Sequence, residues 1–519
     1  MSSYRSELTR LGDMARLYAS ETPNKIAFVC DGREQTYQQY NAHCNQVANG
    51  LTQMGAPAQG RIGYIGKNSD WYFELLLGGA KANQVMVSVN WRLAPPEVAY
   101  ILQDAEVETL FVDYGFEDMV DGLRTDLPSL KNIIPISQYE HWRDSQSADE
   151  PTVDVSPDDI CVQLYTSGTT GNPKGVQLAH RNLFGLRRPD IEDESWQRWT
   201  EDDVSLVAMP NFHIGGTGWG ISGLYVGAKN VVMPEFDPGQ VLDFIQTYRI
   251  SKLFMVPAAL QIVVRDPRAK DTDFSCLDCI LYGASPIPLD LLKECMTVFG
   301  CGFAQMYGMT ETTGTIVALP PEDHDPEGGP KMRSAGKALP GIDVQIWDDD
   351  GNEVPRGTVG EIVARGPANM KGYWKLPEAT ANTIDADGWL RTGDAGYMDE
   401  DDYVYIHDRV KDMIISGGEN IYPAEVESAL YGHADIADVA VIGVPDDKWG
   451  EAVKACVVVH DGKTLSADDV IAYARTQIAA FKCPKTVDFI PELPRNPSGK
   501  ILRRELRAPY WAGKDRAVN

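Results

Sequence analysis

The sequence has no apolar run long enough to cross a bilayer. The longest one, around Leu253–Val264, is interrupted by Pro257 and Gln261, whereas a spanning helix needs ~18 apolar residues in succession. Near the N-terminus, charged residues from Arg5 to Asp13 stand among apolar ones, which predicts an amphipathic surface helix without the apolar centre of a signal peptide. We therefore expect a cytoplasmic protein without an integral membrane segment.

Cysteine is scarce as well. The nine cysteines are scattered and odd in number, so we expect no disulfide framework and a reducing compartment. Cys276 and Cys279 have the spacing of a metal or redox pair, but no second pair and no nearby histidine accompany them. We interpret both as core or strand residues.

Positive charge is in deficit. Lys and Arg total 47 against 75 for Asp and Glu, and the net charge of −28 argues against nucleic acid and anionic membranes as partners. One segment is basic: Lys482–Arg507 holds seven Lys or Arg against three Asp or Glu. By itself, this segment is equally compatible with a patch that receives an anionic substrate and with a solvated surface.

The sequence does contain a repeated alternation of short apolar strands and helical patterns. Strands are predicted at four early segments: Lys25–Cys30, Gly60–Ile65, Val85–Asn90 and Thr109–Asp113. A buried helix is predicted over Trp71–Ala80. Strands that alternate with helices favour an α/β layered fold with largely parallel sheets. The polar stretch Gln138–Ser156 is predicted to be a surface linker.

After Pro340 the pattern changes to short strands and tight turns, which predicts a β-rich subdomain. A smaller unit follows the charged segment Asp408–Asp412, with a helix that opens at Pro423. We therefore expect the α/β class: a large N-terminal domain of layered α/β subdomains plus a β-rich subdomain, and a small α+β C-terminal domain.

The segment Tyr165–Val176 has the composition of a phosphate-binding loop. It follows a predicted strand, Ile160–Leu164, and contains three glycines, five hydroxyl side chains and Lys174. Glycine lets backbone N–H groups approach a ligand, and hydroxyls, N–H groups and lysine bind phosphate oxygens. It is not a Walker A loop, because the lysine lies between Pro173 and Gly175. Taken alone, such a segment is more often an ordinary surface loop.

Other candidate residues also lie at predicted strand ends, where α/β proteins bind ligands. His213 follows the strand predicted over Val204–Met209, although a single histidine is commonly structural. Thr310 and Glu311 lie at another such junction, and Glu311 offers a carboxylate of the kind that binds Mg²⁺ beside a nucleotide. Near the C-terminus, Lys500 ends a Pro/Ser/Gly loop that can reach out of its domain.

Five motifs in this order resemble those of the adenylate-forming superfamily, which includes acyl-CoA synthetases, aryl-CoA ligases, luciferases and the adenylation domains of peptide synthetases. The motifs are Tyr165–Val176, Tyr307–Glu311, Thr392–Asp394, Asp408–Pro423 and Asn496–Lys500. The resemblance covers essentially the whole chain. It implies an N-terminal adenylation domain over residues 1–408, a hinge at residues 409–412 that includes Lys411, and a mobile C-terminal domain over residues 413–519.

The resemblance also implies roles for individual residues toward ATP, Mg²⁺ and CoA. The β- and γ-phosphates of ATP would be gripped by Thr166, Ser167, Gly168, Thr169, Thr170, Gly171 and Lys174. The adenosine would contact Gly283, Ala284, Ser285, Tyr307, Asp394 and Arg409. Catalysis would fall to Lys500, Thr310, His213 and Glu311, the last as the metal ligand. The acyl pocket would be lined by His213, Trp219, Gly283 and Met306, and CoA would meet Gly417, Gly418 and Lys482.

The expected activity is that of an AMP-forming carboxylic acid–CoA ligase. Because Trp219 is bulky where long-chain enzymes need space, we expect a medium-chain fatty acid or an aromatic, hydroxycinnamate-like acid, unless Trp219 only packs in the core. One alternative is a stand-alone adenylation enzyme that loads a carrier protein, which we favour less because the basic segment Lys482–Arg507 suits the phosphates of CoA. Another is a catalytically dead binding protein, which the presence of Lys500 and Glu311 argues against. A homodimer is left open.

Overall fold

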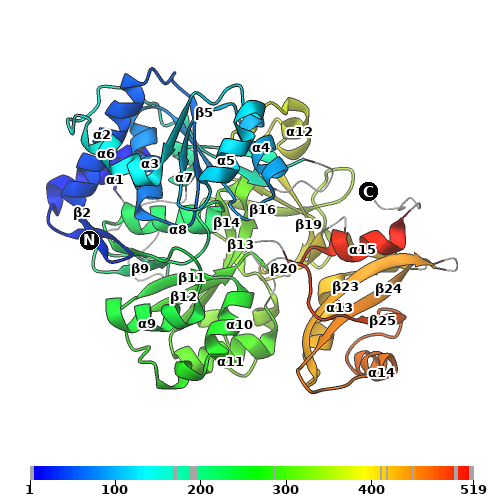
Figure 1. The fold of residues 1–519 in the computed structure, drawn as a ribbon. Helices are drawn as coiled ribbons and strands as arrows, with labels where there is room; N and C mark the ends of the chain where they lie inside the picture. Colours follow the sequence, from blue (N-terminus) through cyan, green and yellow to red (C-terminus); the bar gives the residue numbers. More distant parts are fainter. Residues whose placement is uncertain are drawn as a thin grey trace.

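The computed structural model describes residues 5–166, 172–185, 196–285, 287–409, 412–416, 419–446, 449–495 and 501–512. A large N-terminal body and a smaller C-terminal body lie side by side (Figure 1). The predicted fold class is confirmed: layered α/β subdomains and a β-rich subdomain form the large body, and an α+β unit forms the small one. Within the described part of the chain, every helix is too short or too polar to cross a membrane.

The first layered subdomain is built on a seven-stranded sheet of order β18-β8-β7-β4-β3-β5-β6. Its strands are β3 (Arg61–Ile65), β4 (Val85–Val89), β5 (Val107–Val112), β6 (Asn132–Pro135), β7 (Ile160–Thr166), β8 (Lys174–Ala179) and β18 (Gly372–Tyr373). Strands β3 to β7 pair in parallel, and antiparallel pairing adds β8 and β18 at one edge. The helices of this part are α2 (Tyr37–Gln53), α3 (Asp70–Lys81), α4 (Pro95–Asp104), α5 (Glu117–Leu123) and α7 (His180–Leu183).

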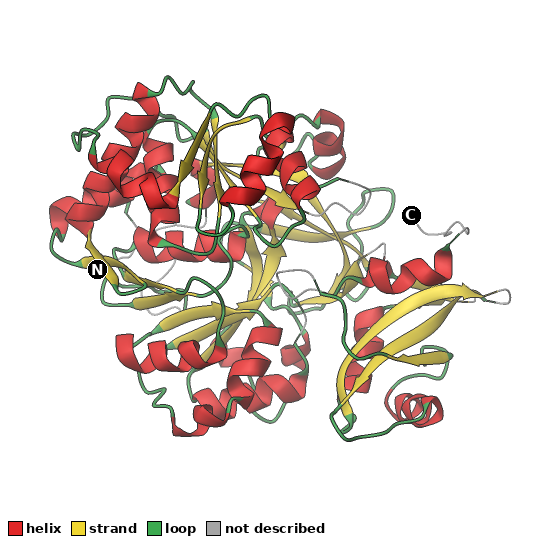
Figure 2. Cartoon of the chain, in the orientation of Figure 1, coloured by secondary structure: helices red, strands yellow, loops and turns green. Residues whose placement is uncertain are grey.

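The second layered subdomain has a nine-stranded sheet of order β15-β14-β13-β12-β11-β9-β10-β1-β2. Its strands are β1 (Ile26–Cys30), β2 (Arg33–Thr36), β9 (Val204–Val207), β10 (Lys229–Val232), β11 (Lys252–Met255), β12 (Cys279–Gly283), β13 (Gly302–Met309), β14 (Gly314–Leu319) and β15 (Lys337–Ala338). The outer face of this sheet carries α9 (Pro238–Tyr248), α10 (Pro257–Arg265) and α11 (Leu289–Phe299), as Figure 2 shows.

Helix α8 (Ile214–Tyr225) joins the two subdomains. It lies between their sheets and shares one hydrophobic core with α3 (Figure 1). A Cβ at Gly220 would come within 2.3 Å of the Phe73 ring, so glycine is needed where the two helices meet. This tight packing fixes α8 as a wall beside the carboxyl ends of the strands.

The β-rich subdomain and the C-terminal domain complete the chain. An antiparallel sheet of order β16-β17-β19-β20 is formed by β16 (Asp343–Trp347), β17 (Gly360–Arg365), β19 (Leu390–Met398) and β20 (Val404–Arg409), with α12 (Pro377–Thr383) beside it. The C-terminal domain contains β21 (Ile414–Ser416), β22 (Glu419–Ile421), α13 (Pro423–Tyr431), β23 (Ile436–Asp446), β24 (Gly450–Val459), α14 (Ala467–Gln477), β25 (Thr486–Phe489) and α15 (Arg503–Trp511). Its hydrophobic core is separate, as a domain that folds as its own unit requires.

The N-terminal helix differs from the prediction. Helix α1 (Leu11–Glu21) begins only near the end of the charged segment Arg5–Asp13, and it buries Leu11, Met14 and Tyr18 while Arg16 and Glu21 stay exposed. Its one acidic residue near the start, Asp13, is 7% exposed and accepts hydrogen bonds from two arginine side chains at 3.1 and 2.8 Å. The helix is amphipathic as expected, but most charged residues of the predicted segment precede it.

The segment predicted as a surface linker, Gln138–Ser156, is a loop in its second part, but its first part belongs to α6 (Ile136–Asp144). The hydroxyl of Tyr139 and the guanidinium of Arg143 donate to the fully buried carboxylate of Glu74 at 2.7 and 3.0 Å. Burial raises the pKa of Glu74, but hydrogen bonds from His43 and Tyr139 and the charges of His43 and Arg143 outweigh it and lower the pKa to about 2. The linker prediction was wrong for residues 138–144, because polar residues of α6 serve a buried carboxylate rather than solvent.

Candidate active site

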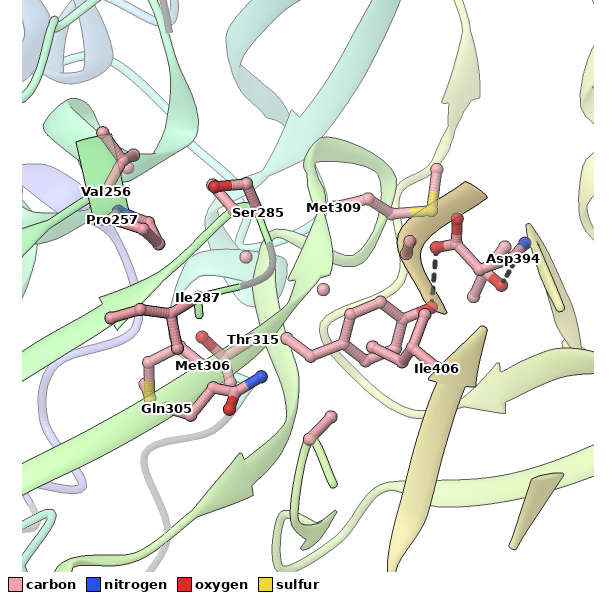
Figure 3. Close-up of a pocket in the computed structure, with 18 of the residues that line it drawn as sticks. Val256, Pro257, Ser285, Ile287, Gln305, Met306, Met309, Thr315, Asp394 and Ile406 are labelled. Carbon is pink, nitrogen blue, oxygen red and sulfur yellow. Dashed lines mark hydrogen bonds between the residues drawn. The ribbon is translucent and has the colours of Figure 1, made fainter. Parts of the chain in front are cut away.

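A large cleft is lined by both layered subdomains, the β-rich subdomain and the C-terminal domain. The strands β7, β12 and β13 reach it with their carboxyl ends, the edge at which α/β sheets bind ligands. Figure 3 shows apolar side chains such as Val256, Pro257 and Ile287 at one side of the view, and Asp394 with Ile406 at the other. One continuous cleft therefore offers both an apolar and a polar region.

The two ends of the predicted phosphate loop lie opposite each other in this cleft. Thr166 ends β7 and Lys174 begins β8, and the two residues are partners across the antiparallel ladder. The ammonium of Lys174 lies 4.8 Å from the ring centroid of Tyr373, a distance at which cation–π attraction holds the lysine in place. The loop contacts predicted at the intervening positions lie outside the described residues: Ser167, Gly168, Thr169, Thr170 and Gly171.

Glu311, the predicted Mg²⁺ ligand, is a nearly buried carboxylate that lines the cleft. It lies beside Thr310 in the short helix η3 (Thr310–Thr312), directly after β13, and is 5% exposed. Its Oε1 accepts hydrogen bonds from the hydroxyls of Tyr373 at 2.8 Å and Thr166 at 3.4 Å. Among the described residues, no donor reaches Oε2. Carboxylate oxygens are the ligands that Mg²⁺ prefers, and Oε2 of Glu311 is available to such an ion.

The predicted ribose and adenine residues also meet in the cleft. The hydroxyl of Tyr307, on β13, donates to Oδ2 of Asp394, on β19, at 2.7 Å, and Asp394 is 7% exposed (Figure 3). The backbone N–H of Asp394 donates to the hydroxyl of Thr392 at 3.1 Å, which fixes the turn of the chain there. Arg409 is the ladder partner of Asp394, but its side chain lies outside the described residues.

The residues at the end of β12 are small because the neighbouring strand leaves little space there. A Cβ at Gly283 would lie 2.1 Å from the carbonyl oxygen of Met306, so a larger residue does not fit between the neighbouring strands. Ala284 has a φ of 66°, a left-handed conformation that residues other than glycine rarely adopt. Ser285 follows and lines the cleft (Figure 3). The three predicted adenine-site residues thus form one strained turn at the cleft wall.

Of the four residues predicted for the acyl pocket, His213, Trp219 and Met306 line the apolar region, whereas Gly283 is not among the lining residues. His213 is the N-cap residue of α8. Trp219 lies one turn and a half further along this helix, is 8% exposed and packs against Trp199 and Phe254, with ring centroids 4.8 and 6.1 Å away. The pocket is therefore walled by aromatic rings.

Two features of this pocket were not predicted from the sequence. Trp199 belongs to the wall although it stands in a loop before β9, where no motif marks it. The cleft lining also continues past Trp219 along α8 to Ser222 and Tyr225. Trp219 therefore narrows the pocket without closing its end.

Most cations of the basic segment Lys482–Arg507 form ion pairs with carboxylates of the C-terminal domain or of the segment that leads into it. The Lys482 ammonium, predicted to bind CoA, contacts the Glu425 carboxylate at 2.6 Å. Three further cations of the segment pair with carboxylates at 2.7 Å: Arg495 with Asp438, Arg503 with Glu427 and Arg507 with Asp412. The predicted hinge residue Lys411, the glycines Gly417 and Gly418, and the catalytic Lys500 lie outside the described residues.

Comparison with known families agrees with this geometry. A family model described as AMP-binding enzyme matches residues 16–374, and one described as AMP-binding enzyme C-terminal domain matches residues 425–500. The chain belongs to the AMP-binding enzyme family. The predicted membership of the adenylate-forming superfamily, and with it the enzyme class of AMP-forming acyl-CoA ligases, is confirmed.

Relatives of known activity align over nearly the whole chain of this AMP-binding enzyme. The fatty acid–[acyl-carrier-protein] ligase ScoC of Streptomyces coeruleorubidus is 43% identical, over 99% of both chains. A feruloyl-CoA synthase of an Amycolatopsis species is 38% identical, over 96% of this chain and 99% of its own. Among solved structures, the anthranilate CoA ligase AuaEII in complex with anthranoyl-AMP has a TM-score of 0.89 and 28% identity, over 98% of each chain.

Proposed function

We propose that the protein joins a hydrophobic carboxylic acid to CoA at the expense of ATP, in the cytoplasm and with Mg²⁺. The observation that carries the proposal is that the polar group of Thr166, Lys174 and Glu311 lines the same cleft as the aromatic pocket around Trp219. Adenylation requires a triphosphate and an acid to be held next to each other in one site. The aromatic pocket wall supports a medium-chain fatty acid or an aromatic acid as the substrate.

In the first half-reaction, a carboxylate oxygen of the acid attacks the α-phosphorus of ATP and pyrophosphate leaves. Both reactants are anions, so the rate depends on groups that align them and offset their charge. Lys174 holds the outer phosphates, Thr310 and Lys500 contact the α-phosphate, and His213 lies near the acid. Glu311 would hold Mg²⁺, which would supply positive charge to the phosphate oxygens.

In the second half-reaction, a thiol attacks the acyl carbon and AMP leaves. We infer that the C-terminal domain turns about Lys411 between the two steps, so that Gly417 and Gly418 replace Lys500 at the cleft. The separate core of this domain supports movement as a unit. A hinge at one or two residues that end secondary-structure elements is a common device of domain closure.

CoA is the proposed thiol because the feruloyl-CoA synthase relatives use it as their names state. A carrier protein is the second candidate, and two observations favour it. The relative at 43% identity is named for an acyl-carrier protein. In addition, Lys482 and Arg503 are paired with carboxylates of this chain, which weakens the argument that the basic segment receives the phosphates of CoA.

The test is ATP–pyrophosphate exchange on a panel of fatty and aromatic acids, followed by product formation with CoA or with a carrier protein bearing the phosphopantetheine arm. We expect exchange on hydrophobic acids and thioester formation with free CoA. Exchange with transfer only to the carrier protein would favour the second candidate. No exchange on any acid would contradict both candidates.

Replacing Trp219 with alanine is expected to open the narrow part of the pocket. Because one methylene in an apolar pocket changes kcat/KM by about tenfold or more, acids longer than the best wild-type substrate should gain at least about tenfold relative to it. The measurement is kcat/KM across a chain-length series. Trp389→Ala is the matched control, since Trp389 is also 8% exposed but does not line the cleft. An unchanged profile in Trp219→Ala would assign Trp219 to core packing alone.

A further inference from the structure

Tyr373 contacts two of the proposed phosphate and metal residues although no motif marks it. It lies on β18, the two-residue strand that pairs with β8 at the edge of the seven-stranded sheet, and it is 8% exposed. Its hydroxyl donates to Oε1 of Glu311 at 2.8 Å, and its ring lies under the Lys174 ammonium at 4.8 Å. A single side chain thus touches both a carboxylate and a cation of the site.

The backbone around Tyr373 holds it in this position. The N–H of Met370 donates to the carbonyl oxygen of Glu311 at 2.8 Å, and the N–H of Tyr373 donates to the hydroxyl of Thr380 at 2.9 Å. Tyr373 is also the ladder partner of Val176 on β8, the strand that begins with Lys174. The segment is therefore anchored to Glu311 on one side and to β8 on the other.

We propose that Tyr373 is a positioning residue that sets Glu311 for the metal and Lys174 for the triphosphate; this inference rests on the proposed function. The hydroxyl donates to Oε1, which leaves Oε2 as the oxygen available to a ligand. The aromatic face limits the positions that the flexible lysine can take. Removal of such outer contacts to a metal ligand typically costs 10–100-fold in metal affinity.

The test measures ATP binding by calorimetry without acid or thiol, so no turnover is needed, across a range of Mg²⁺ concentrations. Tyr373→Phe removes the hydroxyl and keeps the ring. We expect the Mg²⁺ concentration at half-maximal ATP binding to rise about tenfold or more, with binding in EDTA unchanged. Tyr373→Leu removes the ring as well and should also weaken ATP binding in EDTA, because Lys174 loses its support.

Tyr403→Phe is the matched control. The Tyr403 hydroxyl donates to Asp323 at 2.7 Å and its ring lies under the Lys331 ammonium at 4.7 Å, but Tyr403 does not line the cleft. This control should leave the Mg²⁺ dependence of ATP binding unchanged. Thermal unfolding midpoints of all variants show whether they fold.

A double-mutant cycle with Glu311→Gln separates positioning from a general structural effect. If the hydroxyl acts through the carboxylate, Tyr373→Phe should have no further effect on Mg²⁺ dependence in the Glu311→Gln background. Equal effects of Tyr373→Phe in both backgrounds, or an unshifted Mg²⁺ curve in Tyr373→Phe, would overturn the positioning role alone. A wild-type protein that does not bind ATP would instead contradict the proposed function, and this inference with it.

Discussion

Lys500→Ala is expected to lower the rate of acyl-adenylate formation by about 100- to 1,000-fold, the loss that follows removal of one transition-state donor in other enzymes. The reason is electrostatic: the attacking carboxylate and the α-phosphate are both anionic, and the lysine would bridge them as charge develops. The measurement is single-turnover release of pyrophosphate with ATP and the preferred acid. Thioester formation from supplied acyl-AMP should remain largely intact, because a different face of the C-terminal domain would serve that step.

Lys485→Ala is the matched control for this prediction. Lys485 lies in the same domain and the same basic segment, but it is exposed and lies outside the cleft lining. Its replacement should leave both half-reactions at the wild-type rate. Equal loss of both half-reactions in Lys500→Ala would contradict the proposed division of labour between the two faces of the domain.

Arg143→Met is expected to destabilise the fold by about 3–5 kcal/mol, the cost of leaving one member of a buried ion pair without its partner. Glu74 has no exposed surface, and Arg143 contributes a guanidinium 3.0 Å from its carboxylate. Methionine keeps much of the volume of arginine and removes the charge. The free energy of unfolding from urea titration at neutral pH measures the effect.

An ion pair on the surface provides the control, and the pH dependence of the free energy of unfolding provides a second measurement. Arg356→Met breaks an exposed pair with Asp402 at 2.8 Å and should cost only about 0–1 kcal/mol. The folded pKa of Glu74 is about 2, below the value of about 4.3 for an unfolded glutamate. The contribution of ionised Glu74 to the free energy of unfolding is therefore fully present above the unfolded pKa, and it is lost as the pH falls toward the folded pKa. The decrease in the free energy of unfolding between neutral and acid pH should become smaller in Arg143→Met. An unchanged decrease would contradict the role of Arg143 in holding Glu74 ionised.

The parts of the site that lie in local motifs were predictable from the sequence. Glu311 and Asp394 belong to short motifs that resemble those of the superfamily; Glu311 follows the strand β13, whereas Asp394 lies within the strand β19. Parallel strands bring their carboxyl ends to one edge of a sheet. The cleft location of Glu311 therefore follows from strand prediction, whereas that of Asp394 follows only from the motif.

The parts that depend on contacts between distant segments were not predictable. Tyr373 meets Glu311 only because the short strand β18 pairs with β8, and a two-residue strand leaves no periodic signal. The ion pair between Lys482 and Glu425 was also not predictable, because the two residues are distant in the sequence. Composition alone therefore counted Lys482 as part of an open basic patch. For α6, polar composition suggested a linker because the buried partner, Glu74, lies far away in the chain.

The central claim, that the acid is activated by bonding to the α-phosphate, can be tested by isotope transfer. The acid is supplied with ¹⁸O in both carboxylate oxygens, and the products of a complete reaction with ATP and the accepting thiol are analysed by mass spectrometry. We expect one ¹⁸O in AMP and one in the thioester carbonyl, because the oxygen that attacks phosphorus leaves with AMP. Label in pyrophosphate or inorganic phosphate, with none in AMP, would contradict the account.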